Sequence, residues 1–510
     1  MICSFAVLYN YSLHRNFWPD AEYAIRAYHL LLNDYANIPN VLPLNSVYGV
    51  LDYIIYYING FNIQSLRIEA TLTYGIIILL SIFPALYSRN TCKINFYLIP
   101  FFIFLLIIIN PGSSYYCGSH AEGFHMYPYD MHTQSTILSL LGINFLVLYE
   151  KSKGKAKKIL LIPIVILAVV GYKYSDMIFV LAFSLPLMVY LLNFLYWKKI
   201  REKLTREKVK QYVAYLMFIC FGFISIMRLI SLVTDNNLLL FSDRSDSGFA
   251  DTTEIYKNFF VVATELLALF NVELTGKSVL NLSNIVIVLR VVVVIIFLLS
   301  IGRNIRGMIK KESFEKIKIA DFVMSVGSIL IILFLLITNY GSYVRCIRYM
   351  IPILFYATIL LSRDIDIKCE GIDSNRIKQA LIVLFATAIL INFKPFWYMD
   401  SYKDAYEEPL YEISKYVEEN NLGNGGASYW AAPILTALMN GDNIVISGIP
   451  RTDRYASENY YSRITKIYWV VDSPIHPQEG VEYLGEPTST YSYGDYTLYY
   501  FEDGISVTAE

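Results

Sequence analysis

The sequence predicts an all-α polytopic membrane domain with about 10 to 12 transmembrane helices, followed by an extracytoplasmic α/β domain. Apolar residues make up 55% of the 510 residues and charged residues only 17%, whereas soluble domains contain about 25% charged residues. Long apolar runs recur as far as residue 393 and then give way to the shorter helix and strand patterns of a soluble domain. We therefore expect a transmembrane domain over 1–393 and a soluble domain over 394–510.

Several apolar runs are long enough to cross the roughly 30 Å hydrocarbon core of a bilayer. They lie at 67–87, 96–110, 134–149, 159–173, 177–197, 211–233, 282–302, 319–338, 346–362 and 379–393. The run Val41–Asn59 is also apolar, but as a full span it would place the basic segment 151–158 outside the cell. We interpret it as an in-plane or re-entrant helix at the outer surface.

Every second connection between these runs is rich in lysine and arginine, as in 151–158 (KSKGKAKK) and 198–210 (KKIREKLTREKVK). Basic loops remain in the cytoplasm, so the alternate connections face outward. The outward set is 13–66, 111–133, 174–176, 234–281, 339–345 and 394–510. The pattern predicts a multi-pass plasma-membrane protein whose first outward loop is 13–66 and whose C-terminal domain is extracytoplasmic.

The C-terminal segment has the alternation of a small α/β or α+β domain. Residues 407–420 have apolar side chains at helical spacing, and 421–426 form a cluster of turn-forming residues. Residues 443–447 and 467–471 have the composition of buried strands, and 493–501 alternate as an edge or hairpin strand does.

Composition excludes several classes of function. The net charge of −1 gives no reason to expect nucleic acid as a partner. The six cysteines include no CxxC pair, so neither a disulfide framework nor a zinc site is predicted. Cys117 and Cys346 both fall in or near outward segments, and a single bridge between them stays open. No GxGxxG or Walker motif is present, so we expect no nucleotide-binding loop.

The first outward loop carries an acidic pair at the start of a predicted helix. Pro19 opens this helix, and the carboxylates of Asp20 and Glu22 fall at its N-terminus, where the helix dipole favours negative charge. Asp20 has two interpretations. It is either an N-cap or a general base at the membrane surface that deprotonates an acceptor hydroxyl.

The second outward loop, GSHAEGFHMYPYDMHTQ, concentrates histidines and carboxylates. Its candidate substrate-binding residues are His120, His125, Asp130 and His132. Their spacing matches neither HExxH nor any zinc signature, so we assign no metal site. We expect this loop to line a donor or acceptor cleft through hydrogen bonds. A requirement for a divalent metal stays open, and no cofactor is assigned.

The outward segment 234–281 is predicted to form a flap followed by an interfacial helix near 256–271. Its acidic residues do not follow the order of an EF-hand loop. In the next apolar run, Arg290 is expected to face the protein interior or a wet cavity, because a cation in contact with lipid is costly.

The first ninety residues resemble the beginning of GT-C fold glycosyltransferases. The matching features are Trp18-Pro19-Asp20-Ala21-Glu22-Tyr23-Ala24, Pro43-Leu44, Gly60-Phe61 and Arg67 at the start of a span. The most similar members in kind are the lipid-A aminoarabinose transferases and the protein O-mannosyltransferases, which use a polyprenyl-phosphate sugar as donor. The resemblance implies that the catalytic base is an acidic residue of the first outward loop, here Asp20 with Glu22 beside it.

Two later stretches are similar to the same class. Asp176 stands where these enzymes often have an acidic residue at an outer helix start, although an N-cap is an equal interpretation. The stretch Arg348-Tyr349-Met350-Ile351-Pro352 resembles a late Arg-Tyr-x-x-Pro segment. With Arg345 it offers two cations to a donor phosphate or, alternatively, to lipid headgroups. One departure is Asn40-Val41-Leu42-Pro43, which lacks the Glu-Lys-Pro of aminoarabinose transferases and leaves the donor open.

Together these features predict a glycosyltransferase that moves a sugar from a polyprenyl-phosphate donor to a hydroxyl of an envelope glycan, lipid or protein outside the bilayer. The main alternative is a transporter or flippase of lipid-linked saccharide, for which paired inverted halves with broken helices are typical. No such internal symmetry is visible in the sequence. A non-catalytic assembly protein would have no use for the outward histidines and carboxylates.

Overall fold

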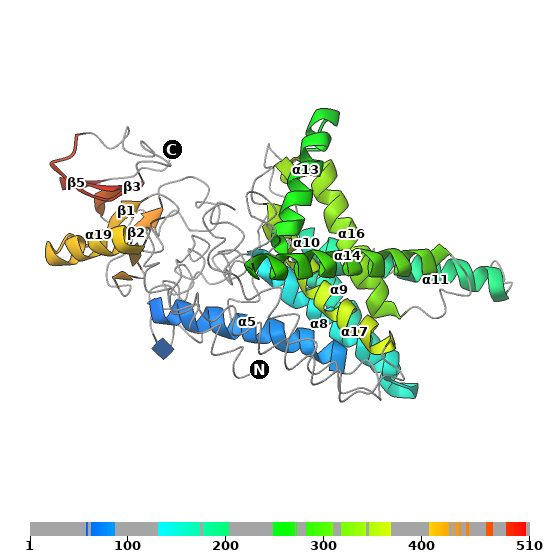
Figure 1. Ribbon diagram of the computed structural model, residues 1–510. Helices are drawn as coiled ribbons and strands as arrows, with labels where there is room; N and C mark the ends of the chain where they lie inside the picture. Colours follow the sequence, from blue (N-terminus) through cyan, green and yellow to red (C-terminus); the bar gives the residue numbers. More distant parts are fainter. Residues whose placement is uncertain are drawn as a thin grey trace. The chain divides into compact units, whose positions relative to one another are not determined.

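The chain is described by a computed structural model in which most of the described residues are helical (Figure 1). The described residues are 58–59, 63–86, 131–173, 177–202, 248–270, 272, 282–309, 318–342, 346–368, 407–427, 431, 435–436, 438–439, 445–447, 466–472 and 486–505. They fall into two compact units. One contains the helices from 131 to 368, and the other contains the C-terminal helix and sheet.

The described part of the helical unit consists of long, mostly apolar helices together with short π and 3₁₀ turns. Its elements are α5 (Ile63–Leu86, from Gly75 onward), α8 (Met131–Lys151), α9 (Gly154–Lys173), α10 (Met177–Phe179), the π turn η3 (Val180–Ser184), α11 (Leu185–Glu202), α13 (Thr252–Leu269), α14 (Leu282–Ile309), α16 (Ile319–Ile337), the 3₁₀ turns η4 (Asn339–Ser342) and η5 (Cys346–Met350), and α17 (Ile351–Lys368). By length and composition, Met177–Phe194 and Ile319–Ile337 could each cross a membrane.

Helix α16 forms the centre of this unit, with α8, α11, α13, α14 and α17 packed against it. Its buried side chains include Phe322, Met324 and Leu335. Helices α9 and α14 instead leave large apolar side chains such as Ile159 and Leu299 exposed. Because broad apolar surfaces are unfavourable in water, this pattern indicates contact with lipid. Arg290 of α14 is only 3% exposed, as expected for a cation in an apolar helix.

The helices coincide with seven of the predicted apolar runs, and 96–110, 211–233 and 379–393 lie outside the described residues. The basic connections between helices are shorter in the structure than the sequence predicted. Between α8 and α9 only Ser152 and Lys153 are not helical, and α11 and α14 continue to Glu202 and Ile309. Lysine and arginine are good helix formers, so a helix can continue into the basic segment beyond its apolar part.

The described part of the C-terminal unit contains a helix and a five-stranded sheet. Helix α19 (Glu407–Glu419) precedes β1 (Gly425–Ala427), β2 (Val445–Ser447), β3 (Lys466–Asp472), β4 (Ser489–Tyr493) and β5 (Tyr496–Ile505). The strand order is β2-β1-β3-β5-β4. Strand β1 is parallel to β2 and β3, whereas β5 is antiparallel to β3 and β4. The mixed sheet confirms an α/β architecture here.

The predicted helix, the buried strands and the hairpin strand are present, but two boundaries were wrong. The hairpin strand was predicted from residue 493, whereas the chain turns at Gly494 (φ 57°) and β5 begins at Tyr496. The predicted turn 421–426 ends in strand β1, which begins at Gly425. An added Cβ would lie 2.1 Å from the Tyr468 ring at Gly425 and 2.1 Å from the Trp469 ring at Gly426. These glycines therefore allow close ring packing in a strand rather than a turn.

Gly426→Ala is expected to destabilise the protein by about 1–3 kcal/mol, because the new methyl group must displace the buried Trp469 ring. Thermal unfolding of the purified full chain, followed by near-UV circular dichroism, measures this effect. Gly302→Ala is the matched control, since a Cβ at Gly302 meets nothing within 4 Å. Equal melting temperatures for the two variants would contradict the packing role.

Candidate active site

The structure describes only part of the predicted site. Seven of its residues lie outside the described part of the chain, namely Asp20, Glu22, His120, His125, Asp130, Asp176 and Arg345. The backbone of His132 is in the first turn of α8, and that of Arg348 is in η5. Tyr349 is the predicted site residue whose side chain is described. It is 5% exposed, and its ring packs edge-to-face with the ring of Tyr340, with the two ring centroids 5.5 Å apart.

The turn that carries Arg348, η5, begins nine residues after the C-terminal end of α16, with η4 between them in the sequence. A short bridge pairs Phe249 with Thr338 through Ala250 N–H to Ile337 O (3.0 Å) and Asn339 N–H to Gly248 O (3.1 Å). The chain then forms η4 and η5. This local pairing sets the direction in which the chain leaves α16 toward the predicted phosphate-binding segment.

Asn258 of α13 completes this junction. Its Nδ2 donates to the carbonyl oxygens of Leu336 (3.1 Å) and Thr338 (2.9 Å), with Leu335 O at 3.4 Å. The last carbonyls of a helix have no partner within that helix, so a buried amide that satisfies them is stabilising. Asn258 is fully buried. It therefore fixes α13 to the end of α16.

Asn258→Leu is expected to destabilise the chain by about 1–3 kcal/mol, because buried carbonyls at the end of α16 lose their donor. The melting temperature of the purified chain measures the loss. Lys257→Leu, at an exposed position one residue earlier, serves as the control. If both variants melt at the wild-type temperature, Asn258 has no capping function.

A helix is present where one was predicted near 256–271: α13 begins at Thr252 and ends at Leu269, and its interfacial position stays a prediction. A capping box starts it, with Asp251 accepting from Glu254 N–H and Glu254 accepting from Asp251 N–H. Tyr256, Phe259 and Phe260 form an exposed aromatic row. Burial raises the pKa of Glu265 to about 7. Exposed aromatic side chains and an easily protonated carboxyl both suit the bilayer boundary.

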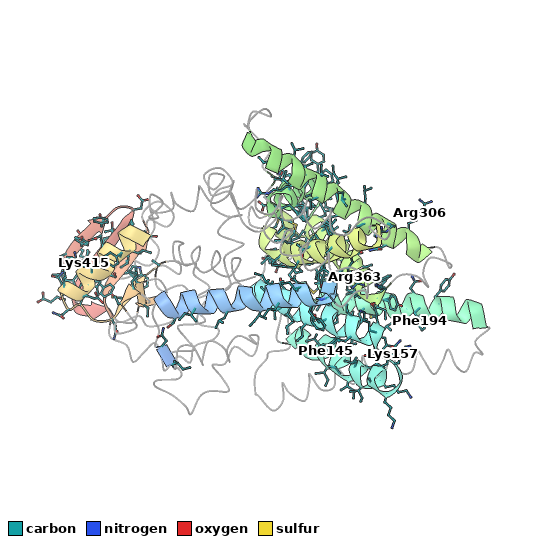
Figure 2. All side chains as sticks on the ribbon, turned by 60° about the horizontal axis from the view of Figure 1, so that its bottom comes forward. Phe145, Lys157, Phe194, Arg306, Arg363 and Lys415 are labelled. Atoms are coloured by element: carbon teal, nitrogen blue, oxygen red, sulfur yellow. The ribbon has the colours of Figure 1, made fainter. Side chains whose placement is uncertain are left out.

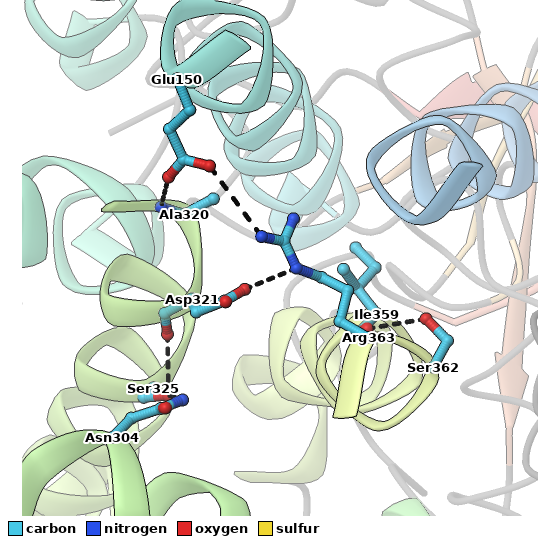
Figure 3. Close-up of polar contacts among 8 residues, drawn as sticks. All are labelled: Glu150, Asn304, Ala320, Asp321, Ser325, Ile359, Ser362 and Arg363. Atoms are coloured by element: carbon cyan, nitrogen blue, oxygen red, sulfur yellow. Dashed lines mark hydrogen bonds and ion pairs between the residues drawn. The ribbon is translucent and has the colours of Figure 1, made fainter. Parts of the chain in front are cut away.

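A second polar cluster lies at the other end of α16 (Figure 3). Arg363 of α17 is 3% exposed, and its Nε lies 2.7 Å from Asp321 Oδ1. Its Nη2 lies 3.9 Å from Glu150 Oε2 of α8. One cation thus stands between two carboxylates from different helices.

The carboxylate of Glu150 also caps the start of α16. Glu150 Oε1 accepts the backbone N–H of Ala320 at 2.9 Å, whereas the N-cap residue Lys318 makes no side-chain capping bond. The N–H groups of the first helical turn have no acceptor within the helix, and the helix dipole favours negative charge there. Glu150 supplies both an acceptor and a negative charge. Asn304 Nδ2 donates to Ser325 Oγ at 2.8 Å and connects α14 to the same end of α16. The cluster ties four helix ends together.

Sequence reasoning missed this cluster, although a signal was present. Glu150, Asp321 and Arg363 each lie at or just beyond the end of a predicted apolar run, where charges were assigned to basic loops or to no role. These partners are far apart in the sequence, and no local pattern reveals their pairing. In the described part of the chain no group of three metal-ligating side chains occurs. Cys346 is fully buried, whereas Cys117, its candidate partner in a bridge, lies outside that part.

Comparison with known proteins gives one informative match. No protein-family model matches the chain, and no curated protein sequence matches it. Among solved structures, the crystal structure of ArnT from Cupriavidus metallidurans in the apo state is similar over 98% of this chain and 96% of that chain, with a TM-score of 0.56 and 10% sequence identity. At this identity the likeness shows the fold alone: the chain has the same overall fold as this ArnT structure.

Proposed function

We propose that the chain is an outward-facing glycosyltransferase that moves a sugar from a polyprenyl-phosphate donor to an acceptor hydroxyl of an envelope glycan, lipid or protein. The observation that carries this proposal is the fold likeness to ArnT, which extends over nearly the whole of both chains. The acidic pair Asp20 and Glu22 in the first outward loop supports it from the sequence.

The proposed enzyme is a multi-pass plasma-membrane protein with about 10 to 12 spans and an extracytoplasmic domain over 394–510. The regular basic loops support this topology, as do the apolar helices and their exposed apolar side chains. The residues at the two ends of α16 also agree with the proposed topology. The basic-loop end holds the Arg363 cluster, whereas the other end leads into the segment of Arg348.

In the proposed reaction Asp20 accepts the proton of the acceptor hydroxyl as its oxygen attacks the anomeric carbon. The new glycosidic bond forms while the bond between that carbon and the phosphate oxygen breaks. Polyprenyl phosphate leaves, and Arg345 and Arg348 stabilise its charge. Glu22 lies beside the base. The substrate-binding side chains are proposed to be His120, His125, Asp130, His132, Asp176 and Tyr349.

Arg348→Gln is expected to lower kcat/KM for the donor by about 10²-fold, because a charge-assisted contact to the leaving phosphate is lost. Arg348→Lys keeps the positive charge but loses the bidentate hydrogen bonding of the guanidinium group. It is expected to recover part of the kcat/KM that Arg348→Gln loses. Purified protein and a panel of polyprenyl-phosphate-linked mannose, glucose, galactose and aminoarabinose provide the assay. Arg306→Gln, on the exposed face of α14, is the control. Unchanged donor kinetics in Arg348→Gln would favour the contact with lipid headgroups.

Mass spectrometry of envelope glycans separates the transferase from a flippase. Cells are compared that contain the wild-type chain, the Asp20→Asn variant or neither. A transferase predicts a sugar that is present only with the wild-type chain. If Asp20→Asn restores that sugar as fully as the wild-type chain does, Asp20 is not the catalytic base.

A further inference from the structure

Strand β4 forms one edge of the C-terminal sheet. Its partner on one side is β5, and in the described part of the unit no strand pairs with its other side. Exposed strand edges are usually protected by charged residues, proline or a bulge, because their free backbone groups pair readily with other chains. The residues of β4, Ser489–Tyr493, include neither a charge nor a proline, and their register with β5 is regular. The edge therefore keeps hydrogen-bonding groups available for a partner.

The side chains of this edge are neutral and carry hydroxyl groups. Every residue of β4 has a hydroxyl group, and all of them except Tyr491 are exposed. Next to the turn, Ser492 Oγ lies 3.0 Å from Thr497 Oγ1 of β5 in an exposed hydrogen bond. Asp495 is the single charged residue of Ser489–Phe501. The hairpin thus offers many groups that both donate and accept hydrogen bonds and almost no charge.

Three tyrosines lie beside this edge, on the face of the sheet against which α19 packs. Tyr416 of α19 and Tyr491 of β4 stack with their ring centroids 3.9 Å apart and an angle of 3° between the rings. Both rings are only partly buried, against a core that includes Leu410 and Leu498. Tyr493 is two residues further along the same face of β4 and is 38% exposed. The core thus holds aromatic rings in place while part of their surface stays in contact with solvent.

Helix α19 is aligned with the hairpin, and this alignment fixes the tyrosine stack. Near the start of the helix, Pro409 lies against the turn, because a Cβ added at Gly494 would be 3.0 Å from Pro409 Cγ. Seven residues further along the helix, Tyr416 meets Tyr491, which is three residues from Gly494. Seven helical residues and three strand residues both cover about 10 Å. One alignment therefore makes both contacts, so the position of the stack is built into the domain.

A neutral glycan has the chemistry that this surface recognises. The C–H groups on one side of a pyranose ring pack against the face of an aromatic ring, which carries partial negative charge. Sugar hydroxyls exchange hydrogen bonds with the hydroxyls of tyrosine, serine and threonine and with the free backbone groups of an edge strand. Nucleic acid and anionic lipid headgroups instead require lysine or arginine, and neither occurs in Ser489–Phe501.

We propose that the edge of β4, with the Tyr416–Tyr491 stack and Tyr493, binds a neutral glycan, and that this glycan is the acceptor of the transferase. The acceptor role rests on the proposed function and selects envelope glycan from the three acceptor classes named there. The domain is predicted to lie outside the bilayer, on the side where such a glycan is found. Because glycan binding and transfer belong to one chain, the bound acceptor has a raised effective concentration for transfer.

Isothermal titration calorimetry of the purified full chain in nanodiscs tests the binding without any donor. The probes are neutral hexasaccharides of mannose, glucose, galactose and N-acetylglucosamine, and the hexasaccharide of galacturonic acid is the charged counterpart. At least one neutral probe is expected to bind, and saturation-transfer NMR should show its ring C–H hydrogens closest to the protein. Failure of every neutral probe to bind, or binding of the charged probe alone, would overturn the proposal.

Single variants locate the binding on the described surface. Tyr493→Ala removes one exposed ring with little loss of packing and should weaken binding by about 2- to 10-fold, the usual effect of one aromatic contact. Tyr491→Leu removes the stack but keeps an apolar side chain on the core, and it should weaken binding at least as much. Tyr411→Ala is the matched control, because Tyr411 is 54% exposed on α19 but about 140° around the helix from Tyr416. An equal loss of affinity in Tyr411→Ala and Tyr493→Ala, at wild-type melting temperatures, would contradict a specific site.

Transfer kinetics connect the surface to the acceptor and separate this proposal from the proposed function. With the neutral glycan that binds as acceptor, Tyr493→Ala should raise the acceptor KM by the same factor as the Kd. The kcat and the donor KM should not change, because the variant weakens only the hold on the acceptor chain. An unchanged acceptor KM would refute the acceptor role. If the glycan binds but the wild-type chain transfers no sugar from any donor, the proposed function fails while the glycan-binding surface stands.

Discussion

Replacing Asp20 with asparagine is expected to lower the rate of sugar transfer by about 10²- to 10⁴-fold, the range typical for loss of a general base. Asparagine has the shape of aspartate but cannot accept the proton of the acceptor hydroxyl. Donor binding does not require that proton, so the donor KM should stay close to the wild-type value. Steady-state kinetics with the polyprenyl-phosphate donors measure both parameters.

The same substitution distinguishes catalysis from helix capping. Asparagine and aspartate are equally good N-caps, so a capping role predicts an active and stable Asp20→Asn variant. Asp20→Ala would remove both functions and cannot separate them. Glu22→Gln is the matched control, since it removes the neighbouring charge and keeps the proposed base. A larger loss in Glu22→Gln than in Asp20→Asn would transfer the catalytic role to Glu22.

Replacing Arg363 with methionine is expected to destabilise the chain by about 3–5 kcal/mol, the usual cost of removing one partner from a buried ion pair. The substitution removes the cation that pairs with both of the mostly buried carboxylates of Asp321 and Glu150. It also removes the link between α17 and the start of α16. Thermal unfolding of the purified chain measures the loss.

Two variants show whether the loss comes from the cluster. Arg306→Met removes an exposed arginine from α14 and should leave the melting temperature nearly unchanged; Figure 2 labels both arginines. The triple variant Glu150→Gln/Asp321→Asn/Arg363→Met leaves no buried charge, so it should recover much of the stability lost in Arg363→Met. A triple variant less stable than Arg363→Met would mean that the charges themselves stabilise the fold.

The helices were predictable because membrane spans have a strong one-dimensional signal. Apolar runs gave the positions of α14 and α16 to within a few residues, except where basic side chains continue a helix. The strand β1 was not predictable, because Gly425 and Gly426 have the composition of a turn. Only the rings of Tyr468 and Trp469, which come from a distant strand, explain them.

The site was less accessible to sequence reasoning. Partners such as Glu150 and Arg363 come together only through packing of distant helices. The π turn η3 had a local signal, because Pro186 lies within an apolar run, but the Tyr356 hydroxyl that donates to Ala182 O in place of the missing N–H could not be inferred. The catalytic assignment to Asp20 comes from its loop and from resemblance, and it stays a prediction.

The most direct test of the transferase function uses purified wild-type chain in liposomes with each donor of the polyprenyl-phosphate panel, radiolabelled in the sugar. Membrane lipid extract and envelope glycan serve as acceptors. The expected result is release of polyprenyl phosphate with transfer of the label to an acceptor, at least about 10²-fold faster than with Asp20→Asn. Movement of intact donor across the bilayer without release of polyprenyl phosphate, for every sugar in the panel, would contradict the transferase and favour a flippase.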